Sequence, residues 1–279
     1  MGLESDTLLA IYARQPLSVK RGIPIFSQPS IISENYDRIA RDHLSATQRG
    51  IANPFMGESL WQSLEGSTLQ LLKKYCANGN RILDVGVGLG RLLDGLDHCH
   101  RYGVDITVEY LELAKNRGIE VCVAEASDLP YHENFFDVIV CTDVLEHVFD
   151  VNAAIKSMLR VLKAHGILII RVPDREDLSP YVEPHYPYRF AHLRNFDEPG
   201  LQLLFSRIFG CEFVETVYVH VCYDIKMRFP FPPVARHLIT KALNLVLSPA
   251  AKMTSYIASQ LYNPLELNVV FRKPVNDLQ

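Results

Sequence analysis

The chain has 279 residues, a formal net charge of −4 and 48% hydrophobic residues, a composition typical of a globular protein with a full core. The slightly negative charge, with basic residues scattered along the chain, gives no electrostatic reason to expect a nucleic-acid partner. No signal-peptide pattern opens the sequence and no uncharged apolar run is long enough to span a bilayer, so we expect a cytoplasmic protein.

The N-terminal segment, residues 1–33, has little hydrophobic periodicity and contains three of the chain's prolines. We predict an extended arm here, with a short strand at Gly22 to Phe26. Ser67 to Cys76 has the apolar spacing of an amphipathic helix, and Asn78-Gly79-Asn80 is expected to end it. The next segment, from Arg81, carries the motif that says most about function.

That region begins at Arg81 and reads Arg-Ile-Leu-Asp-Val-Gly-Val-Gly-Leu-Gly. Its first five residues predict a short buried strand, and Leu89 to Leu96 is predicted to form a helix. Three glycines, Gly86, Gly88 and Gly90, lie between the strand and the body of that helix. Because glycine has no Cβ, a ligand can contact the backbone of this turn, as in the crevices at the carboxyl ends of parallel strands.

The spacing of the glycines and the preceding Asp84 indicate the kind of ligand. The dinucleotide fingerprint is Gly-x-Gly-x-x-Gly with a pyrophosphate at the helix N-terminus, whereas this turn reads Gly-x-Gly-x-Gly after a carboxylate. A carboxylate would repel phosphate, but it suits a ligand without phosphate that carries an ammonium and a sulfonium. S-adenosylmethionine fits this description. The alternative is a tight strand-to-helix turn that binds no ligand.

Three further strands are predicted, at Tyr102 to Ile106, Glu120 to Ala124 and Phe136 to Cys141. The third is a nearly continuous apolar run, which favours a central strand buried on both faces. Asp105 lies near the end of the first, where a carboxylate at the tip of a neighbouring strand can accept both hydroxyls of a ribose. The alternative role for this acid is a cap for the helix predicted at Val108 to Asn116.

The glycine turn, the acid at Asp105, an Asp-Leu-Pro triplet from Asp128 and an Asp-x-x-Glu-His segment from Asp143 occur in that order. Together they resemble the class I S-adenosylmethionine-dependent methyltransferases, in the small-molecule "type 11" group that includes quinone-biosynthesis and bacterial polysaccharide-cluster enzymes. The resemblance covers Arg81 to Val148 in register. It implies an α/β, doubly wound, Rossmann-like and mainly parallel sheet with an antiparallel last strand.

The resemblance also implies S-adenosylmethionine as the cofactor and suggests which residues contact it. The Asp128 carboxylate is expected to accept from the adenine amine, while Leu129 covers the ring face. Tyr36, in a Tyr-Asp-x-x-Ala segment, is expected to fold over the ligand, or alternatively to pack on the core from a helix face. The expected cofactor contacts are Tyr36, Asp84, Gly86, Gly88, Gly90, Asp105, Ile106, Asp128, Leu129 and Thr142.

Methyl transfer to a hydroxyl requires a group that accepts the proton. His147 is the first candidate because the register carries it to the edge of the sheet, although the matching histidine of the family is often structural. His192 and His185 lie in a loop rich in aromatic and histidine residues, Tyr181 to Asn195, that we expect to form the acceptor pocket. Asp143 is expected to orient one of these rings. No histidine spacing suits a metal, so no metal site is expected.

A helical insertion, residues 224–264, precedes the last predicted strand, Glu266 to Arg272. We interpret the insertion as a lid, or alternatively as interfacial helices that dock on a membrane through a basic, apolar flank. The predicted organisation is an arm (1–33), a methyltransferase domain (34–223 with 265–279) and this insertion. The remaining predicted elements are Asn152 to Leu162, Ile167 to Val172, Phe196 to Phe209 and Phe213 to Tyr223.

The predicted function is methylation of a small-molecule or glycan acceptor, on oxygen, with a histidine as the base. One alternative is carbon methylation of a quinone-like lipid, which amphipathic helices in the insertion would suit. Another is a catalytically silent binding or scaffold protein of the same fold. The acids Asp84, Asp105 and Asp128 argue against the last alternative, because a silent relative has no need of ligand-facing carboxylates.

Overall fold

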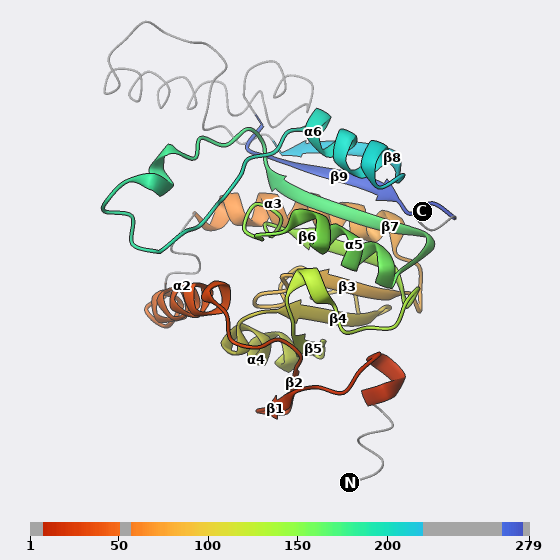
Figure 1. Ribbon diagram of the computed structural model, residues 1–279, viewed down its shortest axis with the longest axis horizontal. Coiled ribbons are helices and arrows are strands. Elements are labelled where there is room, and N and C mark those ends of the chain that lie inside the picture. Colours follow the sequence, from red (N-terminus) through yellow and green to blue (C-terminus); the bar gives the residue numbers. More distant parts are fainter. Residues whose placement is uncertain (1–7, 51–56, 220–263, 276–279) are drawn as a thin grey trace, which may run out of the picture.

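The computed structural model describes residues 8–50, 57–219 and 264–275. Within these ranges one sheet runs through the molecule in the order β1-β2-β5-β4-β3-β6-β7-β9-β8 (Figure 1). The strands are β1 (Ser18–Lys20), β2 (Ile23–Ile25), β3 (Arg81–Val85), β4 (His100–Asp105), β5 (Glu120–Val123), β6 (Phe136–Thr142), β7 (Leu162–Pro173), β8 (Glu212–Val219) and β9 (Glu266–Arg272). The longer helices are α2 (Ile31–Gln48), α3 (Glu58–Tyr75), α4 (Val108–Asn116) and α5 (Val151–Val161).

The five central strands, β5, β4, β3, β6 and β7, are parallel, and β9 runs antiparallel between β7 and β8. The predicted mainly parallel sheet with an antiparallel last strand is therefore confirmed. From β3 the chain winds outward through β4 and β5, and then returns to β6 on the other side of β3. This reversal between β3 and β6 is the topological switch point at which α/β sheets form their ligand crevices.

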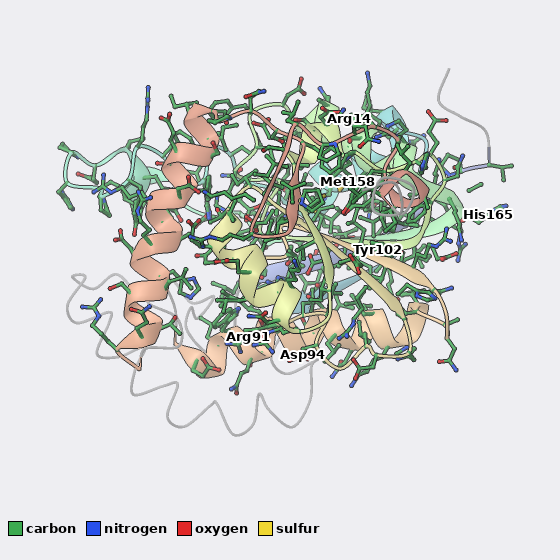
Figure 2. All side chains as sticks on the ribbon, turned by 90° about the horizontal axis from the view of Figure 1, so that it is seen from below. Arg14, Arg91, Asp94, Tyr102, Met158 and His165 are labelled. Atoms are coloured by element: carbon green, nitrogen blue, oxygen red, sulfur yellow. The ribbon has the colours of Figure 1, made fainter. Side chains whose placement is uncertain are left out.

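Helices cover both faces of the sheet, because successive side chains of a strand point to opposite faces. In β3, Leu83 joins the core cluster that contains Met158 of α5, whereas Ile82 joins the cluster that contains Leu111 of α4. The central strands are thus apolar on both sides, as expected for parallel strands. In Figure 2, Met158 and Tyr102 lie among the packed side chains of the interior.

The N-terminal arm adds two strands to the edge of the sheet. Its β1 and β2 form an antiparallel hairpin whose turn residues Arg21 and Gly22 have φ of +55° and +70°. Ile25 then pairs in parallel with Val123 of β5. The strand expected at Gly22 to Phe26 is therefore confirmed, and the arm shields an edge of the sheet that would otherwise present unpaired backbone groups.

The helix predicted at Leu89 to Leu96 is wrong, because this segment forms a series of turns. Gly90 and Gly95 have φ of +74° and +86°, and left-handed residues interrupt an α-helix. A Cβ at Gly90 would lie 2.9 Å from Ala114, so this glycine allows α4 to pack closely against the turns. Its role in the structure is packing.

The C-terminal helix predicted at Phe196 to Phe209 begins as α6 (Glu198–Gln202) and continues as the π-helical turn η3 (Leu203–Ile208). The helices predicted in the insertion, at 234–247 and 250–261, lie outside the described residues. None of the described helices combines the length and the apolar character needed to cross a bilayer.

Candidate active site

A cavity of about 500 Å³ lies at the carboxyl ends of β3, β4, β5 and β6, beside the switch point of the sheet. Its size suits a small-molecule ligand, and its walls are largely apolar, with a few convergent acids. The predicted site residues that line it are Tyr36, Asp84, Gly86, Gly88, Asp105, Ile106, Thr142, Asp143 and His147. Gly90, Asp128, Leu129 and His192 do not line it.

The glycine turn forms one wall of the cavity. Gly86 and Gly88 have φ of +83° and +49°, a backbone conformation that side chains other than glycine rarely adopt. A Cβ at Gly86 would meet Cγ2 of Val144 at 2.2 Å, whereas a Cβ at Gly88 would meet nothing within 4 Å. Gly86 is therefore required by packing, and Gly88 leaves space in which a ligand can approach the backbone.

Asp105 connects this turn to the end of β4. One carboxylate oxygen accepts from the amide of Thr107 at 2.9 Å and the other from the amide of Gly88 at 3.0 Å. Burial raises the pKa of Asp105, and these amides act against that rise. Asp105 thus fixes the backbone at Thr107, directly before α4, and its side chain also faces the cavity. Each carboxylate oxygen retains a lone pair that can accept from a ribose hydroxyl.

Asp84 is buried at the floor of the cavity with a side chain that is incompletely paired. The residue is 2% exposed, and Oδ1 has no hydrogen-bond partner among the described residues. Burial raises the pKa of Asp84 to about 7, with Arg171 acting in the opposite direction. An unpaired buried carboxylate is costly unless a cation or a donor satisfies it. The ammonium of S-adenosylmethionine fits this need, as the space at Gly88 fits its approach.

Arg171 is a buried cation on β7 that the sequence analysis did not single out. It pairs with Asp143, lies 2.8 Å from Glu266 and donates to Thr68 at 3.1 Å. Burial opposes its charge, but Asp143 and Glu266 raise the pKa of Arg171. Arg171 thereby fixes Asp143 at the rim of the cavity. An arginine within the apolar run Ile167 to Val172 was the signal available in the sequence.

Asp128 and Leu129, predicted to contact the adenine, lie away from the cavity. Leu129 is fully buried in the core, and its amide donates to Ser157 at 2.8 Å. Asp128 forms an ion pair with Arg14 at 2.6 Å, and this partner lowers the pKa of Asp128. A leucine in the core cannot cover a ligand ring, so the adenine contacts expected of this pair do not fit the structure.

The residues that do line this side of the cavity are Glu125, Ala126 and Ser127, directly after β5. A carboxylate oxygen of Glu125 accepts from the hydroxyl of Ser30 at 3.1 Å, which ties it to the start of α2. The short helix η1 (Ala126–Asp128) then turns the chain away from the cavity. The sequence contained a signal for Glu125, because parallel strands present their ligand-binding residues immediately after their carboxyl ends.

Aromatic residues from α2 and α3 form the opposite wall. The ring of Tyr36 lies edge-on to the ring of His147, with centroids 5.4 Å apart, and burial raises the pKa of Tyr36. Trp61 lies against the guanidinium of Arg91, 3.7 Å from the ring centroid, a distance typical of a cation–π contact. Both aromatic rings line the cavity. Tyr36 therefore lies on the cavity wall and belongs to neither core cluster, and its contact with the ligand stays a prediction.

His147 lies at the rim, where β6 ends. Its Nδ1 donates to the carbonyl of Ala191 at 3.2 Å, which leaves the lone pair on Nε2. Burial and the neighbouring His192 lower the pKa of His147 to about 4, so the ring is neutral at pH 7. The two imidazole rings meet edge to face, with centroids 4.5 Å apart.

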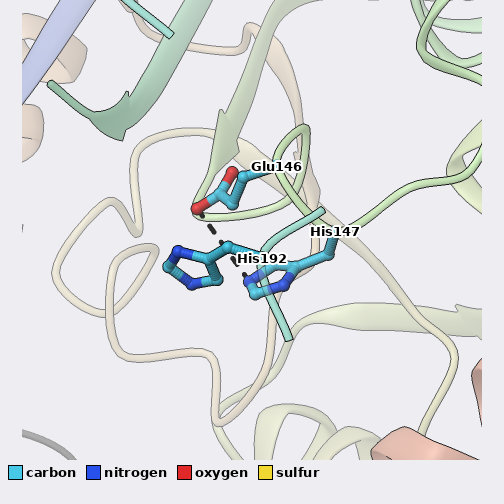
Figure 3. Close-up of side chains that lie close together, drawn as sticks. All are labelled: Glu146, His147 and His192. Atoms are coloured by element: carbon cyan, nitrogen blue, oxygen red, sulfur yellow. Dashed lines mark ion pairs between the residues drawn. The ribbon is translucent and has the colours of Figure 1, made fainter. Parts of the chain in front are cut away.

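Behind His147 lies a second set of polar side chains. Nδ1 of His192 binds the carboxylate of Glu176, which also accepts from the hydroxyl of Tyr181 at 2.6 Å. Glu146 is 1% exposed, and one of its oxygens lies 3.9 Å from Nε2 of His147 (Figure 3). Burial raises the pKa of Glu146 well above its ordinary value. The structure thus brings His147 and His192 together, but only His147 reaches the cavity.

Comparison with known proteins gives a family match to this region. Residues 83–170 match the family model described as a methyltransferase domain. An uncharacterized protein of Methanocaldococcus jannaschii is 34% identical over 132 residues, 47% of this chain and 63% of that protein. The tRNA (carboxymethyluridine(34)-5-O)-methyltransferase of Arabidopsis thaliana is 36% identical over 107 residues, 37% of this chain and 26% of that protein.

A ubiquinone/menaquinone biosynthesis C-methyltransferase of Vibrio parahaemolyticus is 30% identical over 133 residues, 43% of this chain and 51% of that enzyme. The chain thus spans less than two thirds of the length of each of these relatives.

Solved structures show the same fold over most of the chain. An S-adenosylmethionine-dependent methyltransferase of Thermotoga maritima has a TM-score of 0.54 at 20% identity, with 87% of this chain and 99% of that one covered. The methyltransferase in complex with the Haloferax volcanii activator Trm112 has a TM-score of 0.60 at 16% identity, with 89% and 100% covered. Residues 83–170 thus match the methyltransferase-domain family, and the chain around them has the fold of S-adenosylmethionine-dependent methyltransferases.

Proposed function

We propose that this protein transfers a methyl group from S-adenosylmethionine to an oxygen of a small-molecule or glycan acceptor. The observation that carries the proposal is that one cavity is lined by Asp84 and Asp105 and also by His147. The acids suit the cationic and ribose parts of the cofactor, and the neutral imidazole suits an acceptor proton. The cofactor and the acceptor can therefore meet in one cavity.

The cofactor supplies an already activated methyl group, so the chain's own task is to bind, align and exclude water. Asp84 provides a buried carboxylate for the ammonium, and Asp105 provides acceptors for the ribose. Glu125 lies after β5 on the side left for the adenine. Holding the acceptor oxygen in line with the methyl group can supply much of the rate through proximity alone.

We assign to His147 the role of the base that accepts the proton of the acceptor hydroxyl. Its Nδ1 is occupied by the Ala191 carbonyl, so Nε2 is the nitrogen free to accept a proton. Asp143 lies on the same rim, fixed by Arg171, and can accept a hydrogen bond from the incoming hydroxyl. His192 lies behind the first ring and not on the cavity wall, so its role is to position His147.

The names of two relatives point to two alternative acceptor classes. The Vibrio relative is named as a C-methyltransferase of quinone biosynthesis, which supports carbon methylation of a quinone-like lipid. The Arabidopsis relative is named as a tRNA methyltransferase, which reopens nucleic acid as an acceptor. The net charge of −4 favours an uncharged small acceptor over tRNA, because phosphate contacts dominate nucleic-acid affinity.

The first experiment is calorimetry of the purified chain with S-adenosylmethionine and S-adenosylhomocysteine. We expect micromolar binding that Asp105→Ala abolishes, while Asp97→Ala binds normally, because the Asp97 side chain is 80% exposed in a turn outside the cavity. If neither ligand produces heat with the wild-type chain, the proposal is wrong.

The second experiment measures methyl transfer to panels of hydroxylated small molecules and glycans, quinones and tRNA by mass spectrometry. His147→Gln should lower kcat about 100-fold or more, the contribution of a general base, with cofactor affinity retained. Product from quinones or tRNA alone would contradict the assignment of the acceptor class. A scaffold protein would bind the cofactor and methylate none of the panels.

A further inference from the structure

Behind the cavity rim at His147 lies a cluster that the sequence analysis did not foresee. Ligand-type atoms of Glu146, His147 and His192 lie within 4.8 Å of one another (Figure 3). No sequence spacing suggested a metal, because His192 lies far along the chain from the other two. The loop that carries it returns to the rim, where the amide of Leu193 donates to the carbonyl of Glu146 at 2.8 Å.

Both imidazoles are oriented in the way that metal-binding histidines usually are. Nδ1 of His147 donates to the Ala191 carbonyl, and Nδ1 of His192 donates to the Glu176 carboxylate. Metal-ligating histidines almost always donate their second ring N–H to a backbone carbonyl or a carboxylate in this manner. In both rings Nε2 is then the nitrogen that carries the lone pair.

A second observation, independent of how the two imidazoles are oriented, comes from Glu146. Its side chain is 1% exposed, and neither carboxylate oxygen has a hydrogen-bond partner among the described residues. Arg194, a cation from the same returning loop, donates instead to the carbonyls of Leu145 and Val148. A buried carboxylate beside two imidazole side chains, with no donor of its own, lacks the cation that would satisfy it.

We propose that Glu146, His147 and His192 bind one divalent transition metal ion, with Zn²⁺ as the first candidate. Two histidines and one glutamate form the ligand set of several catalytic zinc sites, in which the fourth position stays open. Around a tetrahedral zinc the ligand atoms lie about 3.4 Å apart, so the 3.9 Å between His147 and Glu146, and the separations within the cluster of up to 4.8 Å, must shorten when the metal binds. Because His147 lines the cavity, the open position faces the acceptor.

A metal here would change how the acceptor is activated, a consequence that rests on the proposed function. In the metal-bound form Nε2 of His147 would be a ligand, and the metal would lower the pKa of an acceptor hydroxyl at the open position, so that this hydroxyl loses its proton to solvent water before its oxygen takes the methyl group. In the metal-free form Nε2 accepts the proton itself. Metal binding as such requires neither the cofactor nor the acceptor.

The test is a titration of the chelator-treated full chain with Zn²⁺ alone, by calorimetry and by metal analysis after dialysis. We expect one zinc per chain in the wild type. Glu146→Gln and His192→Gln should each weaken binding at least 100-fold, and Glu176→Gln about 10-fold to 100-fold, because it only orients a ligand. His98→Gln is the matched control, because that histidine is exposed in a distant turn.

The inference is overturned if the wild-type chain retains no zinc. It is also overturned if Glu146→Gln and His192→Gln bind zinc as tightly as the wild type, since the metal would then sit elsewhere, for example on the free cysteines. Thermal melting confirms that each variant is folded, and the visible spectrum of Co²⁺ gives a second readout of tetrahedral coordination. A chain that binds S-adenosylmethionine but no zinc overturns this inference alone.

Discussion

The amide of Gly88 donates a hydrogen bond to Oδ2 of Asp105 at 3.0 Å, and so joins the turn after β3 to the acid that ends β4. The two strands are parallel neighbours, with Val85 opposite Val104, so their ends meet at one edge. This bond makes the glycine turn and the ribose-side acid a single surface. A change at either residue should therefore affect the cofactor.

A comparison of Gly88→Ala with Gly95→Ala should separate the role of the turn in cofactor binding from the stability cost of alanine at a left-handed position. Gly88 and Gly95 both have positive φ with open space around the Cβ position, but only Gly88 lines the cavity. Alanine at either position should destabilise the chain by about 1–2 kcal/mol, the cost of a left-handed residue. Only Gly88→Ala should also weaken S-adenosylmethionine binding, measured by calorimetry beside thermal melts. Equal affinities for the two variants would contradict this account of the turn.

Binding of S-adenosylmethionine should depend on pH through Asp84. Burial raises the pKa of this carboxyl to about 7 in the ligand-free chain, so at lower pH the acid must lose its proton before it can pair with the ammonium. The affinity for S-adenosylmethionine should therefore fall as the pH drops below 7, with a Kd that rises by up to about tenfold per pH unit. His147, with a pKa lowered to about 4, stays neutral across this window.

The measurement is calorimetry between pH 5.5 and pH 8, in buffers of different ionisation enthalpy, which also counts the protons released. Asp84→Asn should bind more weakly at pH 8 and lose most of the pH dependence. A wild-type affinity that is flat across this range would show that Asp84 does not ionise on binding.

Substitutions of Glu125 and Asp128 test which of these two acids lies beside the adenine of the cofactor. Glu125 lines the cavity, whereas Asp128 pairs with Arg14 outside it. Glu125→Gln should weaken cofactor binding by about 1.5–3 kcal/mol, the scale of a hydrogen bond to a charged group. Asp128→Asn should leave the affinity unchanged and cost at most about 1 kcal/mol of stability, since its ion pair is exposed. The reverse pattern would restore the assignment made from the sequence.

Arg171→Met should destabilise the chain by about 3–5 kcal/mol, because it leaves the buried Glu266 carboxylate without its cation. Glu266 and Arg171 are both buried and lie 2.8 Å apart, so adding Glu266→Gln should recover part of the loss. Arg175→Met is the control, because its ion pair with Asp197 is exposed and should be worth less than about 1 kcal/mol. Urea unfolding at pH 7.5 measures all three. Similar losses for Arg171→Met and Arg175→Met would argue against a structural role for the buried pair.

Much of the fold was predictable because its signals are local. Apolar runs of strand length marked β3 and β6, and the β9 prediction, Glu266 to Arg272, matches the structure residue for residue. The glycines marked the turn after β3 because only a residue without a Cβ readily adopts φ near +80°. Since parallel strands present their carboxyl ends at one edge, the same local signals brought Asp84 and Asp105 to one cavity.

The predictions from sequence were wrong where the outcome depends on the direction of one side chain or on the backbone conformation of one or two residues. The sequence placed an acid after β5 at Asp128, but the turn η1 directs that residue outward and leaves Glu125 at the cavity. The helix expected at Leu89 to Leu96 gave way to turns because glycines at two positions adopt left-handed backbone. A shift of a few residues within a motif is invisible to spacing rules but decides which group meets the ligand.

The sequence by itself determined the class of sheet, the place of the cofactor turn and the acids beside it, since these depend on periodicity and on short-range backbone preferences. Only the tertiary structure decided the chemistry of the rim. Arg171 meets Asp143 and Glu266 across strands, and His192 meets Glu146 and His147 because a distant loop returns to the sheet. Such contacts depend on packing between segments far apart in the chain, which no local pattern encodes.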